Sequence, residues 1–318
     1  MSAHLLSINM VSYNTKDITI QAIRSIDRSL KKSWIRTLSH SDVELVVVDN
    51  ASTDGTCEAI HAIQGELCFD VKVIRQTDNI GFGRGHNLAA SSSDGEYVLL
   101  INTDTMIVED GLSKLFSVYL TYNKPVSFET AIKYDTSGLR RHFIGPKLLN
   151  PDLTPQSSAG AYFTIPTIIG MLFLFGDRWG LTRSSPGTAT QTDWVSGACF
   201  ICKKEYFVEL GGFDSQIFMY MEEVELFHRA AKKGMTIWFE PSARVVHIGS
   251  ASSNKSYPVI QLFRGLLYLY KTHHSPKELA LVQYLLQLKA RISIIIGIVF
   301  GKPYLVETYT RAREQLSL

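Results

Sequence analysis

The sequence has few cysteines, almost no net charge and no signal-peptide pattern. Its 318 residues carry 32 Lys and Arg against 30 Asp and Glu, so the net charge of +2 does not favour nucleic-acid binding. Four cysteines are too few for a disulfide scaffold of this length. Because the N-terminus lacks a basic segment followed by a long apolar core, we expect no secretory signal.

Long hydrophobic runs are also missing, although a hydrophobic share of 45% fits a globular protein with a core. No run reaches the ~18–20 apolar residues of a membrane-spanning helix. Residues 165–175 and 292–300 are shorter apolar runs, and the second is flanked by Lys289, Arg291 and Lys302. Such basic flanks favour a helix that lies on an anionic membrane. Packing of that helix on the domain is the alternative.

Cys199 and Cys202 have the spacing of a redox or zinc pair. No second pair accompanies them, and residues 198–201 form an apolar, strand-like run. We therefore predict that both cysteines are small buried side chains.

Strand-like and helical patterns alternate over the first hundred residues. The predicted strands are 4–11, 44–48, 71–74 and 97–101, and the predicted helices are 16–30, 55–63 and 84–90. This alternation is typical of an α/β fold with a parallel, Rossmann-like sheet that has helices on both faces.

The order changes after Gly111. Residues 123–142 and 145–166 read as irregular. We predict strands at 193–203, 236–240 and 243–247, and helices at 221–233 and 278–300, the last as one or two helices. This organisation predicts a domain over 1–271, with halves 1–110 and 111–271, and a helical extension over 272–318.

Polar residues follow the predicted strands of the first half. Ligands of parallel sheets bind beyond the carboxyl ends of their strands, so these residues are candidates for a binding site. They are Ser12, Tyr13, Asn14, Asp49, Asn50, Gln76, Thr77, Asp78, Asn79, Asn102, Thr103 and Asp104.

Residues 79–87 form a glycine-rich turn that enters a helix. Gly81 would let the backbone approach a ligand closely, with Phe82 beside it. Arg84 or Asn87 could contact phosphate or ribose. The spacing differs from the dinucleotide fingerprint, and an ordinary tight turn is the alternative.

Three further features suggest chemistry. Asp104 ends an apolar strand and could bind a hard cation, or it could cap the next helix. Glu222 and Glu223 open a helix, and an ionised Glu can accept a proton from a hydroxyl. A solvated first helical turn is the alternative for these glutamates. His247 could be a metal ligand or a core histidine.

Taken in order, these segments resemble family 2 inverting glycosyltransferases with the GT-A fold, and specifically a rhamnosyltransferase-like branch that builds bacterial surface polysaccharide. The resemblance covers residues 7 to about 270. It rests on the segments 11–14, 48–52, 79–83, 100–104, 145–148, 193–198 and 211–214, on the acidic cluster at 219–225, and on 245–247.

The resemblance implies roles for individual residues. Asp49 would bind the base or ribose of a nucleotide-sugar donor. Asp104 would hold Mg²⁺ or Mn²⁺ at the diphosphate, with His247 assisting. Glu223 would be the general base. Trp194, with Ser196 and Gly197, would line the acceptor side. The remaining donor contacts would come from Ser12, Tyr13, Asn14, Asn79, Gly81, Phe82, Asn87, Asn102 and Thr103.

Two positions depart from the pattern of that family. Asn102 stands where the metal motif often has a first aspartate, which weakens metal binding or leaves more of it to His247. Glu223 stands where the family usually has Asp, and a misplacement of ~1 Å can cost ~100-fold in rate. Either the backbone compensates or Glu222 takes the role.

The predicted protein is thus a cytoplasmic or membrane-peripheral glycosyltransferase at the inner face of the plasma membrane. It would move a sugar, with rhamnose implied by the resemblance, from a nucleotide donor to a hydroxyl of a glycan or lipid-linked acceptor. A non-catalytic nucleotide-sugar-binding subunit is the alternative. A sugar-nucleotide pyrophosphorylase fits less well, because the first strand–helix turn lacks its glycine-rich loop.

Overall fold

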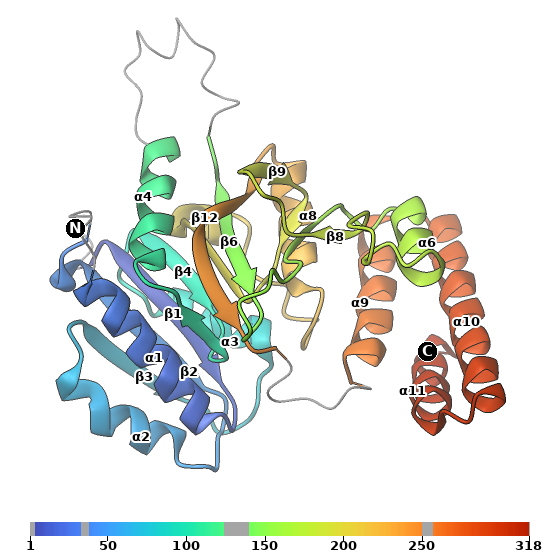
Figure 1. Ribbon diagram of the computed structural model, residues 1–318, viewed down its shortest axis with the longest axis horizontal. Coiled ribbons are helices and arrows are strands. Elements are labelled where there is room, and N and C mark those ends of the chain that lie inside the picture. Colours follow the sequence, from blue (N-terminus) through green and yellow to red (C-terminus); the bar gives the residue numbers. More distant parts are fainter. Residues whose placement is uncertain (1–3, 33–37, 124–139, 250–256, 318) are drawn as a thin grey trace, which may run out of the picture.

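The computed structural model describes residues 4–32, 38–123, 140–249 and 257–317 (Figure 1). Among these, nine strands form the central sheet, in which β9 (Thr190–Thr192) pairs with β12. The other strands lie in the order β3 (Asp70–Arg75), β2 (Val43–Asp49), β1 (Leu6–Ser12), β4 (Tyr97–Ile101), β11 (Cys199–Lys203), β6 (Phe143–Leu149), β12 (Ile237–His247) and β5 (Thr105–Ile107). A small second sheet contains β10 (Trp194–Val195), β7 (Ala159–Gly160) and β8 (Arg183–Ser184).

The first four strands are parallel, as predicted. β1 pairs with β2 and β4, and β2 pairs with β3. Helices α1 (Lys16–Lys31), α2 (Thr56–Ile63) and α4 (Gly111–Asn123) pack on one face, and α3 (Phe82–Ser91) packs on the other. The carboxyl ends of these strands therefore meet at one edge, where the polar residues after β1, β2 and β4 gather.

β11 continues the sheet in the antiparallel direction and contributes to two cores. It pairs with β4 on one side and β6 on the other. Because side chains alternate along a strand, Cys199 joins the core under α1 and α4. Cys202 joins the opposite core, with α8 (Glu222–Lys232) and α9 (Tyr257–His273). Both cysteines are buried and free, which confirms the structural interpretation of the pair.

The prediction that residues 145–166 are irregular is wrong for the start of that range. β6 runs through Leu149 and pairs in parallel with β12. Gly145 and Pro146 hid the strand pattern, because both residues are uncommon inside strands. Gly145 is needed here, since a Cβ at this position would lie 2.7 Å from Cβ of Val195. The irregular segment predicted at 123–142 falls largely outside the described residues.

Two other strand predictions need correction. The predicted strand 193–203 is interrupted at residues 196–198, so that β10 and β11 belong to different sheets. The two strands predicted at 236–240 and 243–247 are one strand, β12, with a shift in register between Glu240 and Arg244.

The C-terminal region is helical, with α9 followed by α10 (Pro276–Val299) and α11 (Pro303–Glu314). α10 is one helix of 24 residues that begins at a capping box of Ser275 and Glu278. By length and composition alone it could cross a membrane, which the apolar run at 292–300 did not indicate. One face of α10 packs on α9, on α11 and on α6 (Ile165–Phe173).

An ion pair between Glu225 and Arg229 links α8 to its surroundings. The Arg229 guanidinium donates to both carboxylate oxygens of Glu225 at 2.6–2.9 Å and to the carbonyl of Gly212. Nε2 of His273 on α9 lies 3.0 Å from the same carboxylate. The Glu225 side chain is 2% exposed, so removing it would leave buried donors unpaired.

Glu225→Ala should lower the free energy of unfolding by about 3 kcal/mol, because one partner of a buried ion pair is lost. Glu58→Ala is the matched control. Glu58 pairs with Arg75 at 3.4 Å on the exposed surface, and such pairs contribute about 0–1 kcal/mol. Urea unfolding of both variants measures the difference, and equal losses would contradict this account of α8.

Candidate active site

A cavity of about 540 Å³ opens at the edge of the sheet where the predicted site residues meet. Its walls come from the ends of β1, β4 and β12, from residues 196–198 between β10 and β11, and from the start of α8. The sequence-predicted residues that line it are Tyr13, Asn50, Asn79, Phe82, Asn102, Thr103, Asp104, Ser196, Gly197, Glu222, Glu223 and His247.

Of the residues to which the resemblance gives a role, six do not line this cavity. Asn87 uses both ends of its amide on the backbone of Phe213, at 2.8 Å each. The Trp194 ring is buried, and its Nε1 donates to the carbonyl of Ala161. Both side chains are thus held by hydrogen bonds to the backbone. The other four are Ser12, Asn14, Asp49 and Gly81.

Three of these four residues, Asn14, Asp49 and Gly81, contact segments distant from them or next to them in the chain. The side-chain oxygen of Asn14 accepts from the backbone of Thr53. Asp49 Oδ2 accepts from the Cys57 thiol at 3.2 Å, and burial with this contact raises the pKa of Cys57 to about 12. Asp49 Oδ1 is buried and has no hydrogen-bond partner in the described part of the chain. Gly81 has φ +89, and a Cβ there would meet the carbonyl of Phe218 at 2.7 Å.

Strand pairing places Asp104 beside His247, although 143 positions separate them in the chain. β5 follows Asp104 directly and pairs antiparallel with the end of β12, so that His247 lies opposite Thr105. His247 Nε2 is 3.4 Å from Asp104 Oδ1. Burial alone would raise the pKa of Asp104, but the hydrogen bond and charge of His247 outweigh it and hold this pKa below its ordinary value.

The other ring nitrogen of His247 is fixed by Gln156. His247 Nδ1 lies 2.7 Å from Gln156 Oε1, while Gln156 Nε2 donates to the carbonyl of His247 and to Asn150. The amide oxygen can only accept, so Nδ1 carries the proton. His247 Nε2 then faces Asp104, where either a second proton or a cation can satisfy both groups.

The side chain of Asn102 completes this group. The Asn102 side chain also helps to lower the pKa of Asp104, and among the described residues its buried Oδ1 has no hydrogen-bond partner. Amide and carboxylate oxygens together with an imidazole nitrogen suit Mn²⁺ and, less well, Mg²⁺. The residues present therefore fit a divalent cation, even though Asn102 replaces an aspartate.

Glu222 and Glu223 both reach the cavity from the first turn of α8. The two residues before this helix, Tyr220 and Met221, have φ of +68 and +75. Non-glycine residues seldom adopt this left-handed conformation, and two in succession turn the helix start into the site. Gly197 faces Glu223, since a Cβ there would lie 3.5 Å from Glu223 Cβ.

The environments of the two glutamates differ. Burial and the charge of Glu223 raise the pKa of Glu222 well above its ordinary value. Burial also raises the pKa of Glu223, but backbone hydrogen bonds, including one from Gly197, and the charge of Arg183 oppose this rise. Both carboxyl groups are therefore harder to ionise than an ordinary glutamate, and in such a pair one carboxyl group can hold a proton while the other accepts one.

Several lining residues have no clear sequence signal. Gln156 lies in a stretch predicted as irregular, and Asp177 and Arg183 lie in an apolar, glycine-containing stretch without periodicity. The only signal that Arg183 offers in the sequence is its charge, which does not distinguish it from the charged residues that are common on protein surfaces. Arg183 lies 5.4 Å over the Trp194 ring, a contact that depends on the β7–β8 pairing.

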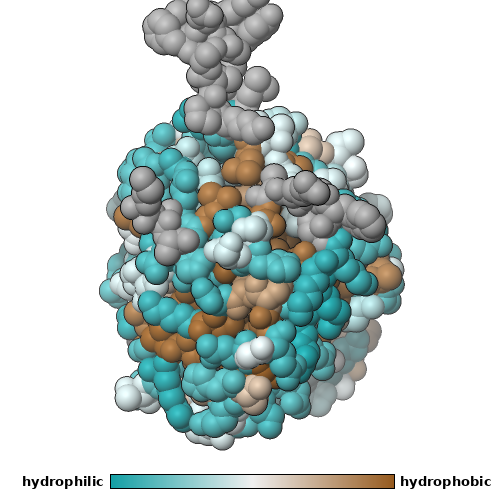
Figure 2. Space-filling model, turned by 90° about the vertical axis from the view of Figure 1, so that its left-hand side faces the viewer, coloured by the Kyte–Doolittle hydropathy of each residue, from teal (hydrophilic) through white to brown (hydrophobic). Residues whose placement is uncertain are grey.

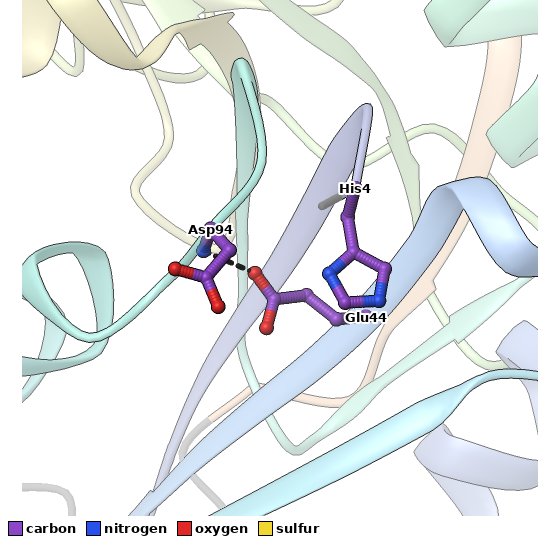
Figure 3. Close-up of side chains that lie close together, drawn as sticks. All are labelled: His4, Glu44 and Asp94. Atoms are coloured by element: carbon purple, nitrogen blue, oxygen red, sulfur yellow. Dashed lines mark hydrogen bonds between the residues drawn. The ribbon is translucent and has the colours of Figure 1, made fainter. Parts of the chain in front are cut away.

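A second group of potential metal ligands lies away from the cavity. His4, Glu44 and Asp94 have ligand atoms within 4.8 Å of one another (Figure 3). They lie near the amino ends of β1, β2 and β4, opposite the edge that holds the cavity. Glu44 Oε1 already accepts from the Ser7 hydroxyl and the Asp94 backbone, both at 2.5 Å. These bonds account for the buried carboxylate without an ion.

The family model for Glycosyl transferase family 2 matches residues 7–175, which is more than half of the 318 residues. The chain therefore belongs to glycosyl transferase family 2, as the resemblance of its motifs predicted. The matched region contains Asp104 but ends before α8.

Two bacterial relatives are rhamnosyltransferases. The N-acetylglucosaminyl-diphospho-decaprenol L-rhamnosyltransferase of Mycobacterium tuberculosis is 27% identical over 236 residues, covering 67% of this chain and 69% of that protein. Rhamnosyltransferase WbbL of Escherichia coli is 25% identical over 174 residues, covering 52% of this chain and 60% of that protein. They place the chain near the rhamnosyltransferase-like branch.

A solved structure shares the fold. The mannosyltransferase PcManGT of Pyrobaculum calidifontis, in complex with GDP-Man and Mn²⁺, aligns with a TM-score of 0.56 at 15% identity. The alignment covers 98% of this chain and 85% of that one. The predicted GT-A fold, with its mixed sheet flanked by helices, is thereby confirmed.

Glu222→Gln should raise the free energy of unfolding, and the gain should grow as the pH rises above the pKa of an ordinary glutamate. A carboxyl whose folded-state pKa is raised costs stability as the pH rises toward that value, by about 1.4 kcal/mol per pH unit. Glutamine mimics the protonated form and removes this cost. Thermal unfolding between pH 4.5 and 8 measures it, with Glu58→Gln as an exposed control. A pH-independent difference would contradict the burial argument.

Proposed function

We propose that this family 2 enzyme transfers a sugar, with inversion, from a nucleoside-diphosphate donor to a hydroxyl of a glycan or lipid-linked acceptor. The observation that carries the proposal is one cavity that contains both an oxygen–nitrogen ligand group and a buried carboxylate pair. The names of the two rhamnosyltransferase relatives favour rhamnose as the sugar. The product would be bacterial surface polysaccharide, such as O-antigen, as the resemblance implies.

Asp104 and His247 would hold Mg²⁺ or Mn²⁺ at the donor diphosphate, with Asn102 as a further oxygen ligand. The bound ion would stabilise the negative charge of the leaving diphosphate as a Lewis acid. PcManGT, which shares the fold, was determined with Mn²⁺ and GDP-Man. Residues at the strand ends, among them Tyr13 and Asn79, would contact the nucleotide.

Glu223 would act as the general base. Its carboxylate accepts the proton of the acceptor hydroxyl while the hydroxyl oxygen forms a bond to the anomeric carbon. The bond from that carbon to the diphosphate oxygen breaks on the opposite face, so a single displacement inverts the anomeric centre. Gly197 leaves room beside Glu223, and Ser196 borders the same space.

The lipid-linked acceptor would place the enzyme at the cytoplasmic face of the membrane. The apolar end of α10, residues 292–300, is mostly exposed and is bracketed by Lys289, Arg291 and Lys302. Each basic residue near an anionic surface contributes about 1 kcal/mol and is screened by salt. The resulting contact would be peripheral, weak and reversible.

Asp104→Ala should remove metal-dependent binding of the donor, because it deletes the charged ligand of the cation and exposes no core. His247→Ala should weaken binding less and be partly rescued by higher Mn²⁺, a metal that accepts nitrogen ligands. Calorimetry with nucleotide sugars, with and without Mn²⁺, measures both effects. Unchanged metal-dependent affinity in Asp104→Ala would overturn the assignment, and an unaltered unfolding midpoint is the control for folding.

Glu223→Gln should keep donor affinity within a few-fold and lower transfer by about 100–10,000-fold, the usual contribution of general-base catalysis. Glu222→Gln is the matched variant and should retain more activity. Donor consumption measured on both variants distinguishes the carboxylates, and the opposite order would assign the base to Glu222. Wild-type protein that binds donors tightly but never consumes them would favour the non-catalytic alternative.

A further inference from the structure

The segment from Leu174 to Leu181, directly after α6, exposes an unusual amount of apolar surface. Leu174, Phe175, Trp179 and Leu181 are 60%, 74%, 70% and 67% exposed. In the described residues up to position 119, the most exposed large hydrophobic side chain is Tyr13, at 43%. Figure 2 shows the side of the molecule formed by these N-terminal residues, where hydrophilic residues cover most of the surface.

The backbone of this apolar segment is ordered by its own hydrogen bonds. The amide of Gly176 donates to the carbonyl of Gly170 on α6, and the amide of Leu181 donates to the carbonyl of Gly176, both at 2.9 Å. The Thr182 hydroxyl donates to the Asp177 carboxylate. Phe175 has φ +53, an unfavourable conformation for a bulky residue. The fold thus holds a phenylalanine in a strained position where its ring faces solvent.

The same segment forms part of the catalytic cavity. Asp177 and Arg183 line that cavity, while the apolar side chains between and before them point to solvent. Directly before this segment, α6 is anchored by Ile168 and Leu172, which are buried in the core. α6 also packs against α10 near the start of α10 (Figure 1). A surface that binds this segment would therefore lie next to the mouth of the cavity.

The charges around the apolar segment are those of a membrane-facing surface. Arg178 and Arg183 are exposed, while the one acidic residue, Asp177, is bonded to Thr182. Aromatic and aliphatic side chains beside arginines are typical of interfacial anchors. Residues 276–318 carry six Lys or Arg and three Asp or Glu, a net +3 against −1 for the rest of the chain. An anionic bilayer complements both features.

We propose that Leu174, Phe175, Trp179 and Leu181 insert into the headgroup–acyl boundary of an anionic bilayer and turn the mouth of the catalytic cavity toward it. This contact is additional to the one at the end of α10. The membrane contact rests on the proposed function only for the identity of the acceptor. If the acceptor is lipid-linked, its diphosphate would lie at the bilayer surface beside Arg183, which can bind phosphate oxygens.

Vesicle binding of the full chain tests the proposal. The wild type should sediment with vesicles of equal phosphatidylglycerol and phosphatidylcholine, and less so with phosphatidylcholine alone or at high salt. The double variant Phe175→Ser, Trp179→Ser should bind at least about tenfold more weakly, because it loses the two largest apolar groups. Leu153→Ser, Val208→Ser is the control, since these residues are 63% and 60% exposed elsewhere. Equal binding by both double variants would overturn the proposal.

Insertion itself can be observed with lipids brominated on their acyl chains, which quench nearby tryptophans. Quenching should be strong in the wild type and should fall in Trp179→Phe, which keeps an apolar ring and should retain vesicle binding. Vesicle binding without any loss of quenching in Trp179→Phe would contradict insertion. A wild type that ignores vesicles but dimerises, with the serine double variant monomeric, would assign the surface to a second copy and overturn the proposal.

Donor calorimetry on the serine double variant separates this proposal from the proposed function. Its metal-dependent donor affinity should equal that of the wild type, because neither substituted residue lines the cavity. Donor binding without membrane binding in the wild type would refute the membrane contact alone. Membrane binding and insertion without donor binding would refute the proposed function while leaving the membrane contact supported.

Discussion

The site depends above all on the pairing of β5 with the end of β12. β5 is three residues long and follows Asp104 directly, so its register against β12 decides which side chain faces that carboxylate. The backbone amide of Ile248 also donates to the carbonyl of Asp104 at 2.9 Å. A slip of one residue would turn His247 to the other face of the sheet. The ligand group therefore exists only when both halves of the domain have folded together.

The same junction brings the carboxylate pair into the cavity. The backbone amide of Asn102 donates to the carbonyl of Ala198, and this hydrogen bond ties the end of β4 to the break between β10 and β11. Gly197 at that break contacts Glu223. The strained turn at Tyr220 and Met221 then presents the first turn of α8 to this space. The strained turn and the contact with Gly197 thus position two carboxyl groups, Glu222 and Glu223, whose pKa values are both raised by burial.

The N-terminal half could be predicted closely from the sequence because its strands and helices have regular periods. Asp104 and His247 could be found because each follows an apolar strand. β6 was missed, since Gly145 and Pro146 interrupt its pattern for reasons of packing against Val195. Arg183 and Gln156 were missed for a different reason. Their roles arise from contacts between segments distant in the chain, and no local pattern encodes such contacts.

The central claim is that Asp104 and His247 hold a divalent cation at the diphosphate of the donor. Pulsed electron paramagnetic resonance on the protein with Mn²⁺ and, in turn, UDP, GDP or thymidine diphosphate measures this directly, because it detects nuclei next to the metal. The account predicts that one of these samples shows both a nitrogen coupling from an imidazole and a phosphorus coupling. The nitrogen coupling should disappear in His247→Ala. Phosphorus coupling without nitrogen coupling in the wild type, or no Mn²⁺ binding with any nucleotide, would contradict it.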